Sequence, residues 1–271
     1  MRRRSDDPNM NNRHMNNRRN SRPSIVLVAS LLVAGSALLM MATDNATPSN
    51  ATDHIPSNVS WTPQTIAAAA SGDAFRGMLL ARRCEHCHGA EGFSPEAKIP
   101  NLAGMDRLAL WKQLEDFRSH KRMSRAMEPI ATSLSSQDVA DVVAYYTKLP
   151  VFTDPQDNRN FPQSQPEPGH AAMASHLVSF GDGERGIPPC QACHGPVAYR
   201  PGAPSLTEQN SEYLLSQLDA FASQARANDI NMAMRTIASL LTEDEKHAIA
   251  EYYGAGLGLQ PGSSGRLGAG K

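Results

Sequence analysis

The chain has 271 residues, enough for one large domain or two small ones, and its composition of 40% hydrophobic and 20% charged residues supports a folded core. A net charge of -1 argues against a dedicated nucleic-acid-binding protein, because such proteins are usually strongly basic. Four cysteines are too few for a disulfide-stabilised scaffold.

The chain opens with a basic lead followed by an apolar stretch. Residues 1–24 hold seven arginines against two aspartates, a net charge of +5, and residues 25–42 carry no charge. Eighteen residues without a charge are long for the apolar region of a cleaved signal sequence but just long enough to span a bilayer. We expect a basic cytoplasmic lead at 1–24, then a signal peptide or membrane anchor at 25–42. The rest should be periplasmic, either free or anchored to the inner membrane.

Composition also predicts how the remaining chain is divided. Residues 43–71 are rich in Thr, Asn, Ser, Pro and Ala and predict a tether, and residues 150–168 contain five prolines and predict a linker. The predicted domains lie at 72–149 and 169–255, and a Gly-rich flexible tail follows at 256–271.

The two predicted domains share five motifs in the same order, which indicates an internal duplication. The first copy reads GDAFRG, CEHCHG, PNLAG, LWKQLEDF and MEPIATSLSSQDVADVVAYY. The second reads GDGERG, CQACHG, PSLTE, LLSQLDAF and MRTIASLLTEDEKHAIAEYY. Cys84 and Cys190 are 106 residues apart, and Met127 and Met234 are 107 apart.

Both copies show helical periodicity, and no useful stretch alternates as a strand would. Leu110, Leu114 and Phe117 follow the i, i+4, i+7 spacing of a helix face. Capping boxes at Ser135 and Thr242 predict helix starts. The predicted fold class is all-α, with two tandem domains, each a small helical fold. A domain of about 80–90 residues has a thin core and usually needs a covalent or metal staple.

That staple is C-x-x-C-H, the attachment pattern of c-type haem, which is present in both copies. Residues three apart on a helical turn share a face, so two thiols can add to the two vinyl groups on one porphyrin edge. The next histidine can then face the iron. A zinc site would leave the histidines unexplained, and a thioredoxin-like pair would need a βαβ context. We predict two covalent haem c groups, bound by Cys84, Cys87, Cys190 and Cys193, with His88 and His194 on the irons.

The internal duplication helps to select the second axial ligand of each haem iron from several candidates. Methionine in a small helical domain also serves as core filler, and the candidates are Met105, Met123, Met127 and His120 in the first copy and Met232 and Met234 in the second. Only Met127 and Met234 align with each other. We therefore predict the axial pairs His88/Met127 and His194/Met234. Two occupied axial positions leave no place for a substrate, so no catalytic residue is predicted.

Three further features have less specific interpretations. Pro100 and Pro204 either shape a loop on the methionine side of the haem or mark a plain turn. The basic run of Arg118, Lys121, Arg122 and Arg125 is typical of a solvated helix face. Residues 72–150 carry a net charge of +1 and residues 170–260 a net charge of -5. This difference suggests that the two halves face different redox partners.

Over roughly residues 72–253 the sequence resembles the cytochrome c4 family, dihaem proteins of two class I cytochrome c domains. The resemblance rests on both C-x-x-C-H motifs, the GD openings at Gly72 and Gly181, the PNL and PSL motifs, the Q-L-x-x-F helices and the two methionines before Ile-Ala. It implies electron transport in a periplasmic respiratory chain, from a quinol-oxidising complex towards a terminal haem–copper oxidase. The arginine-rich lead departs from the family, and PSLTE lacks the glycine of PNLAG.

The alternative function is a dihaem cytochrome enzyme or enzyme subunit, of peroxidase or thiosulfate-oxidising type, with one displaceable axial ligand. The two halves are near-equivalent, and each has its own methionine, which favours a carrier without enzymatic activity. Redox proteins are the expected partners, with the membrane added if residues 25–42 are retained. Nucleic acid and small-molecule substrates are not expected.

Overall fold

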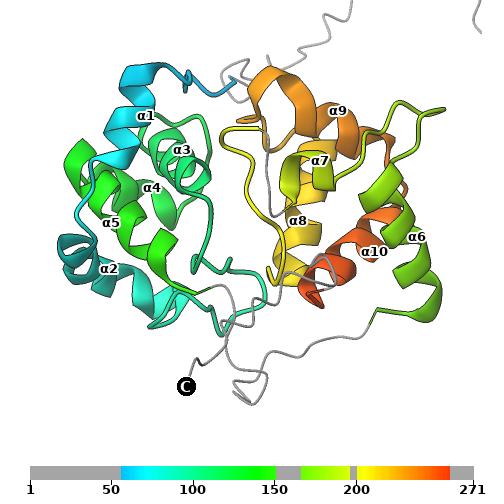
Figure 1. Cartoon of the computed structure of the whole chain (residues 1–271), viewed down its shortest axis with the longest axis horizontal. Helices are drawn as coiled ribbons and strands as arrows, with labels where there is room; N and C mark the ends of the chain where they lie inside the picture. Colours follow the sequence, from blue (N-terminus) through cyan, green and yellow to red (C-terminus); the bar gives the residue numbers. More distant parts are fainter. Residues whose placement is uncertain (1–55, 151–165, 196–199, 257–271) are drawn as a thin grey trace, which may run out of the picture. The chain divides into compact units, whose positions relative to one another are not determined.

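The computed structural model describes residues 56–150, 166–195 and 200–256, and all of them belong to one compact unit. These residues form α-helices and one 3-10 helix, and the only β-structure among them is an isolated bridge between Asp182 and Ile187 (Figure 1). The all-α prediction is confirmed. The predicted lead at 1–24, the apolar segment at 25–42 and most of the linker and tail lie outside the described residues. Among the helices of the described part, none has the length and apolarity to cross a membrane.

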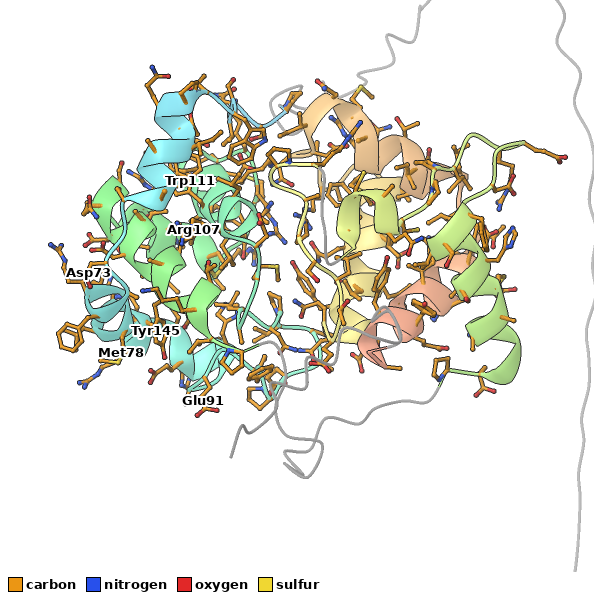
Figure 2. All side chains as sticks on the ribbon, viewed as in Figure 1. Asp73, Met78, Glu91, Arg107, Trp111 and Tyr145 are labelled. Carbon is orange, nitrogen blue, oxygen red and sulfur yellow. The ribbon has the colours of Figure 1, made fainter. Side chains whose placement is uncertain are left out.

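The first half consists of five helices, and all of them except α4 begin at a side-chain cap. They are α1 (Pro63–Ala70), α2 (Ala74–His88), α3 (Arg107–Arg118), α4 (Met127–Thr132) and α5 (Ser136–Lys148). The carboxylate of Asp73, labelled in Figure 2, accepts hydrogen bonds from the first amides of α2. The predicted capping box of Ser135 and Asp138 is present at the start of α5. These local interactions satisfy amide groups that a helix cannot satisfy itself.

The core of the first half lies between α2 and α5. The two helices come close at Gly77, where a Cβ atom would lie 1.9 Å from the Asp141 carbonyl oxygen. Only glycine allows the backbones to approach this closely. The buried apolar cluster consists of Ala81, Leu110, Leu134, Val139, Val142, Val143 and Tyr146.

The second half repeats this plan around a second apolar cluster. Its helices are α6 (Pro168–Phe180), α7 (Gln191–His194), α8 (Ser211–Ala222), the 3-10 helix η1 (Ile230–Met232), α9 (Ala233–Leu240) and α10 (Glu243–Gly254). Helices α6 and α10 pack against each other as α2 and α5 do (Figure 1). The cluster comprises Leu177, Val178, Leu214, Ile249, Ala250 and Tyr253. The capping box predicted at Thr242 and Glu245 is present.

The pairing of the two GD openings was wrong. Helix α2 follows Asp73 and runs without interruption into the first C-x-x-C-H. Helix α6 instead ends before Asp182, whose carboxylate accepts from the amides of Glu184 and Arg185 in a loop that leads to α7. An aspartate with free amides two and three residues later serves a helix start or a tight turn equally well. The structural counterpart of α2 is therefore α6, which precedes the second GD.

Part of the predicted tether is folded onto the first half. Helix α1 packs against α3 and α5, and its N-cap Thr62 accepts from the Thr65 amide. The Ser57 hydroxyl donates to Asp116 at 2.6 Å. The Trp61 ring lies 6.4 Å from that of Trp111, centroid to centroid, the latter labelled in Figure 2. We call residues 56–70 the N-terminal strap. It also reaches the second half, because a Cβ on Gly202 would lie 2.4 Å from Trp61.

Candidate functional site

All eight predicted haem-binding residues lie on the walls of one mostly apolar cavity. Cys84, Cys87 and His88 end α2, Cys190 precedes α7, Cys193 and His194 end α7, Met127 begins α4, and Met234 is the second residue of α9. The four cysteines are free thiols. The structure thus brings together residues that are widely separated in the sequence, with the thiols available for covalent attachment.

The two histidines are held in the same way. Nδ1 of His88 donates to the carbonyl oxygen of Pro100 at 2.8 Å, and Nδ1 of His194 donates to that of Pro204 at 2.8 Å. This bond fixes the ring and leaves Nε2 free to bind a metal. Pro100 and Pro204 therefore support the histidines, and their expected place on the methionine side was wrong. Proline suits this role because its backbone is rigid while its carbonyl still accepts.

Burial controls the protonation of the thiols and imidazoles. It raises the pKa of the Cys84 thiol and raises that of Cys190 to about 11. It also lowers the pKa of both His88 and His194, despite their bonds to the proline carbonyls. The imidazoles are therefore neutral, which is the form that binds a metal.

The methionine candidates differ in their position relative to the cavity. Met105, Met123, Met127 and Met234 lie on its wall. Met232 is 52% exposed and is not part of that wall, and His120 is exposed and bonded to Glu128. In the second half this leaves Met234, whereas three methionines of the first half reach the cavity.

A cluster of polar side chains that the sequence analysis did not identify joins the two halves beside the cavity. Arg122 donates to Gln113 and to Gln217, both at 2.9 Å. Arg226 donates to the same two side-chain oxygens, at 3.0 and 2.7 Å respectively. The Tyr213 hydroxyl accepts from Arg122 at 3.1 Å. The assignment of Arg122 to a solvated face was wrong, since charge in a sequence does not show which partner it meets. The spacing offered a signal, because Arg122 to Arg226 and Gln113 to Gln217 are both 104 residues.

The cavity wall carries an excess of positive charge. It includes Arg83, Lys98, Lys112, Lys121, Arg122, Arg200 and Arg226, against one carboxylate, that of Asp229. Burial and the charge of Arg122 lower the pKa of Arg226 to about 9. The Tyr253 hydroxyl, on the same wall, is buried and has no hydrogen-bond partner among the described residues. Lys112 is paired with the buried Asp116 carboxylate, so the surplus lies in the other cations, and a buried cation without a counter-ion is unfavourable. An apolar cavity with free thiols, neutral imidazoles and surplus cations therefore fits haem, whose flat apolar ring carries carboxylates.

Known proteins resemble this chain in sequence. The family described as cytochrome C oxidase, cbb3-type, subunit III matches residues 67–145. A thiosulfate dehydrogenase electron acceptor from Stutzerimonas stutzeri (strain A1501) is 38% identical over 176 residues, which cover 64% of this chain and 78% of the relative. A cytochrome c4 from Pseudomonas aeruginosa is 34% identical over 69% of this chain and 90% of its own length.

Solved structures share the fold. Reduced recombinant cytochrome c4 from Pseudomonas stutzeri superimposes with a TM-score of 0.61 at 29% identity, covering 68% of this chain and 98% of that one. A thiosulfate dehydrogenase from Marichromatium purpuratum gives a TM-score of 0.57 at 35% identity, covering 66% of this chain and 39% of that one.

Proposed function

Because the chain belongs to the cytochrome c4 family of dihaem electron-transfer proteins, we propose that it carries single electrons between redox partners in the periplasm. Each covalently bound haem supplies one reversible one-electron couple. The observation that carries the proposal is that the two halves contribute the same set of residues. Each brings a C-x-x-C-H motif and a methionine to the cavity. Near-equivalent halves suit a carrier better than an enzyme, which needs one open iron.

The roles of the side chains follow from their positions. Cys84, Cys87, Cys190 and Cys193 would form the thioether bonds. His88 and His194 would bind iron through Nε2, oriented by the two proline carbonyls. Met127 and Met234 would occupy the sixth positions, where a thioether raises the reduction potential. The apolar walls exclude water, which limits reorganisation around the site.

In the first of two candidate routes, electrons pass from a quinol-oxidising complex through this protein to a terminal haem–copper oxidase. The match of residues 67–145 to an oxidase subunit family supports the oxidase end of this route. The charge difference between the halves supports two distinct docking faces, since complementary fields raise association rates.

A thiosulfate-oxidising enzyme is a second candidate donor. The relative that is 38% identical is named for accepting electrons from thiosulfate dehydrogenase. A thiosulfate dehydrogenase structure contains a region that is 35% identical to this chain. In this version the chain receives the electrons and the oxidation of thiosulfate takes place on the donor.

The first experiment is a redox-titrated optical spectrum of the purified holoprotein, following the weak far-red band of a ferric iron–methionine bond. We expect a band equivalent to two haems per chain. Met127→Ala and Met234→Ala should each remove half of it, and Met105→Ala and Met123→Ala should leave it whole. A band that survives Met127→Ala or Met234→Ala would refute the ligand assignment for that half.

The donor is tested by mixing the oxidised holoprotein with a purified quinol-oxidising complex or with thiosulfate dehydrogenase plus thiosulfate. Rapid reduction by one of them identifies the donor. Failure of both would refute the proposed routes while leaving the ligand assignment intact.

A further inference from the structure

We infer that the first half positions the methionine ligand of the second haem, through contacts of Lys112 and Asp116 with Asn228. The inference rests on the proposed role of Met234 as an axial ligand. Asn228 lies six residues before Met234 in the loop that leads into α9. Asn228 would position the methionine ligand of the second haem, and Asn228 is itself held in place by the first half of the protein.

Asn228 is fixed mainly by helix α3 of the first half. Its side-chain Nδ2 donates to Asp116 Oδ2 at 2.7 Å and to Gln113 Oε1 at 3.0 Å. Its backbone carbonyl accepts from Lys112 Nζ. Arg226 supplies the remaining bond, to Asn228 Oδ1 at 2.9 Å. Lys112, Asp116 and Asn228 are at most 3% exposed, so little water competes for these bonds.

The next residue carries this restraint to Met234. The Asp229 carboxylate accepts from the Arg235 amide at 2.9 Å and from Arg235 Nε at 2.7 Å, and both residues are buried. Since Arg235 directly follows Met234, the start of α9 is held by the anchored end of the loop. The Asp229–Arg235 ion pair thus closes the loop, and Asn228 anchors Asp229 to the first half.

The loop between these anchors is strained. Asn231 and Met232 have φ values of 56° and 57°, in the left-handed region that few residues other than glycine adopt. Two consecutive residues in this conformation persist only where the surroundings enforce it. Loss of the anchor at Asn228 should therefore let the loop relax and move Met234.

The corresponding loop of the first half is closed beside Met127 by its own residues, although Arg122 nearer its start bonds to Gln217 and Tyr213 of the second half. Ser124, which is 104 residues before Asn228, donates its amide to Glu128 Oε1 at 2.6 Å. Its hydroxyl accepts from the Met127 amide at 3.2 Å. At this pair of matched positions, Ser124 is therefore held within its own half and Asn228 is held across the interface. The contacts of Asn228 before Met234, unlike those of Ser124 before Met127, depend on the interface being intact.

The test uses the full-length ferric holoprotein and two readouts, the amplitude of the far-red band and the affinity for imidazole. We expect Asn228→Ala to reduce the band to one haem equivalent and to tighten imidazole binding at one haem at least tenfold. Lys112→Met keeps most of the aliphatic side chain but removes the donor to the Asn228 carbonyl. It should have the same effect on the second haem, although residue 112 belongs to the first half. Adding Met234→Ala to either variant should cause no further loss of the band, whereas adding Met127→Ala should abolish it.

Ser124→Ala is the matched control, because Ser124 contacts Met127 and not Met234. Any loss of the far-red band that it causes should be absent in a Met127→Ala background and present in a Met234→Ala background. The inference is overturned if folded Lys112→Met protein keeps a two-haem band and wild-type imidazole affinity. Should Asn228→Ala fail to fold, Lys112→Met decides in combination with Asp116→Asn, so that loss of the Lys112–Asp116 ion pair leaves no buried carboxylate without a partner. If Met234→Ala leaves the wild-type band unchanged, the proposed ligand is wrong and the failure lies there.

Discussion

Arg122 and Arg226, one from each half, donate hydrogen bonds to the same two glutamine oxygens, those of Gln113 and Gln217. Each guanidinium also lies over a phenylalanine ring of its own half, at 4.8 Å for Arg122 and 4.4 Å for Arg226. The arrangement is symmetric because both halves contribute the same residues. It holds two like charges side by side, which requires that their acceptors be kept in place.

Replacing one of these acceptors should weaken the whole unit. In Gln217→Leu both arginines lose a charged hydrogen bond at a partly buried site, and we expect a loss of about 3 kcal/mol in the free energy of unfolding. Gln113→Leu should cost about the same. Urea denaturation measures both, with the exposed Gln64→Leu in α1 as control. A loss in Gln217→Leu no larger than in the control would contradict the structural role.

The close approach of α2 and α5 gives a second prediction. A methyl group at position 77 would meet the Asp141 carbonyl at 1.9 Å, so Gly77→Ala must push the helices apart. We expect a loss of about 3 kcal/mol or more and poor recovery of haem-loaded protein. Gly183→Ala is the control, because nothing lies within 4 Å of its added atom. Thermal unfolding compares the two, and equal midpoints would show that α2 and α5 are not in close contact.

The strap can be tested by a double-mutant cycle between Trp61 and Gly202. Gly202 has a φ of +83°, so alanine there is strained and also meets the Trp61 ring at 2.4 Å. In a Trp61→Ala background only the backbone strain should remain, of about 1–2 kcal/mol. We therefore expect a coupling energy of about 1–2 kcal/mol in urea denaturation. Strictly additive effects would indicate that the strap does not touch this loop.

Acid should weaken the attachment of the loop before α7. Arg185 donates to both carboxylate oxygens of Glu245, at 3.0 and 2.6 Å, and this interaction lowers the pKa of Glu245. A lowered carboxyl pKa gives stability that is present above the ordinary value near 4.3 and lost as the pH falls through the lowered one. Glu245→Gln should therefore be less stable than wild type at pH 7, with the difference shrinking below about pH 4.

The measurement is urea denaturation at a series of pH values, with the exposed Glu184→Gln as control. A stability difference between Glu245→Gln and wild type that stays constant from pH 7 to pH 3 would rule out the ion pair as its source.

Features fixed by neighbouring residues could be predicted from the sequence, and features fixed by distant partners could not. The capping boxes at Ser135 and Thr242 depend on a hydroxyl and a carboxylate three residues apart, so their pattern suffices. The C-x-x-C-H motifs likewise contain their chemistry within five residues. Arg122 meets Gln217 only after the halves dock, and Asp73 and Asp182 have the same local pattern in different elements. Neither the contact of Arg122 nor the difference between Asp73 and Asp182 can be read from a few neighbouring residues.

The N-terminal strap also bears on the order of folding. Ser57 and Trp61 precede all the helices of the described part in the sequence, yet their partners include Asp116 of α3 and the loop at Gly202. These residues are synthesised before α2 to α10 and thus complete their contacts only after most of the chain has followed. Such long sequence separation slows closure, because the loop entropy is lost before the contact forms. Deleting the strap should consequently leave the speed of collapse unchanged while accelerating unfolding.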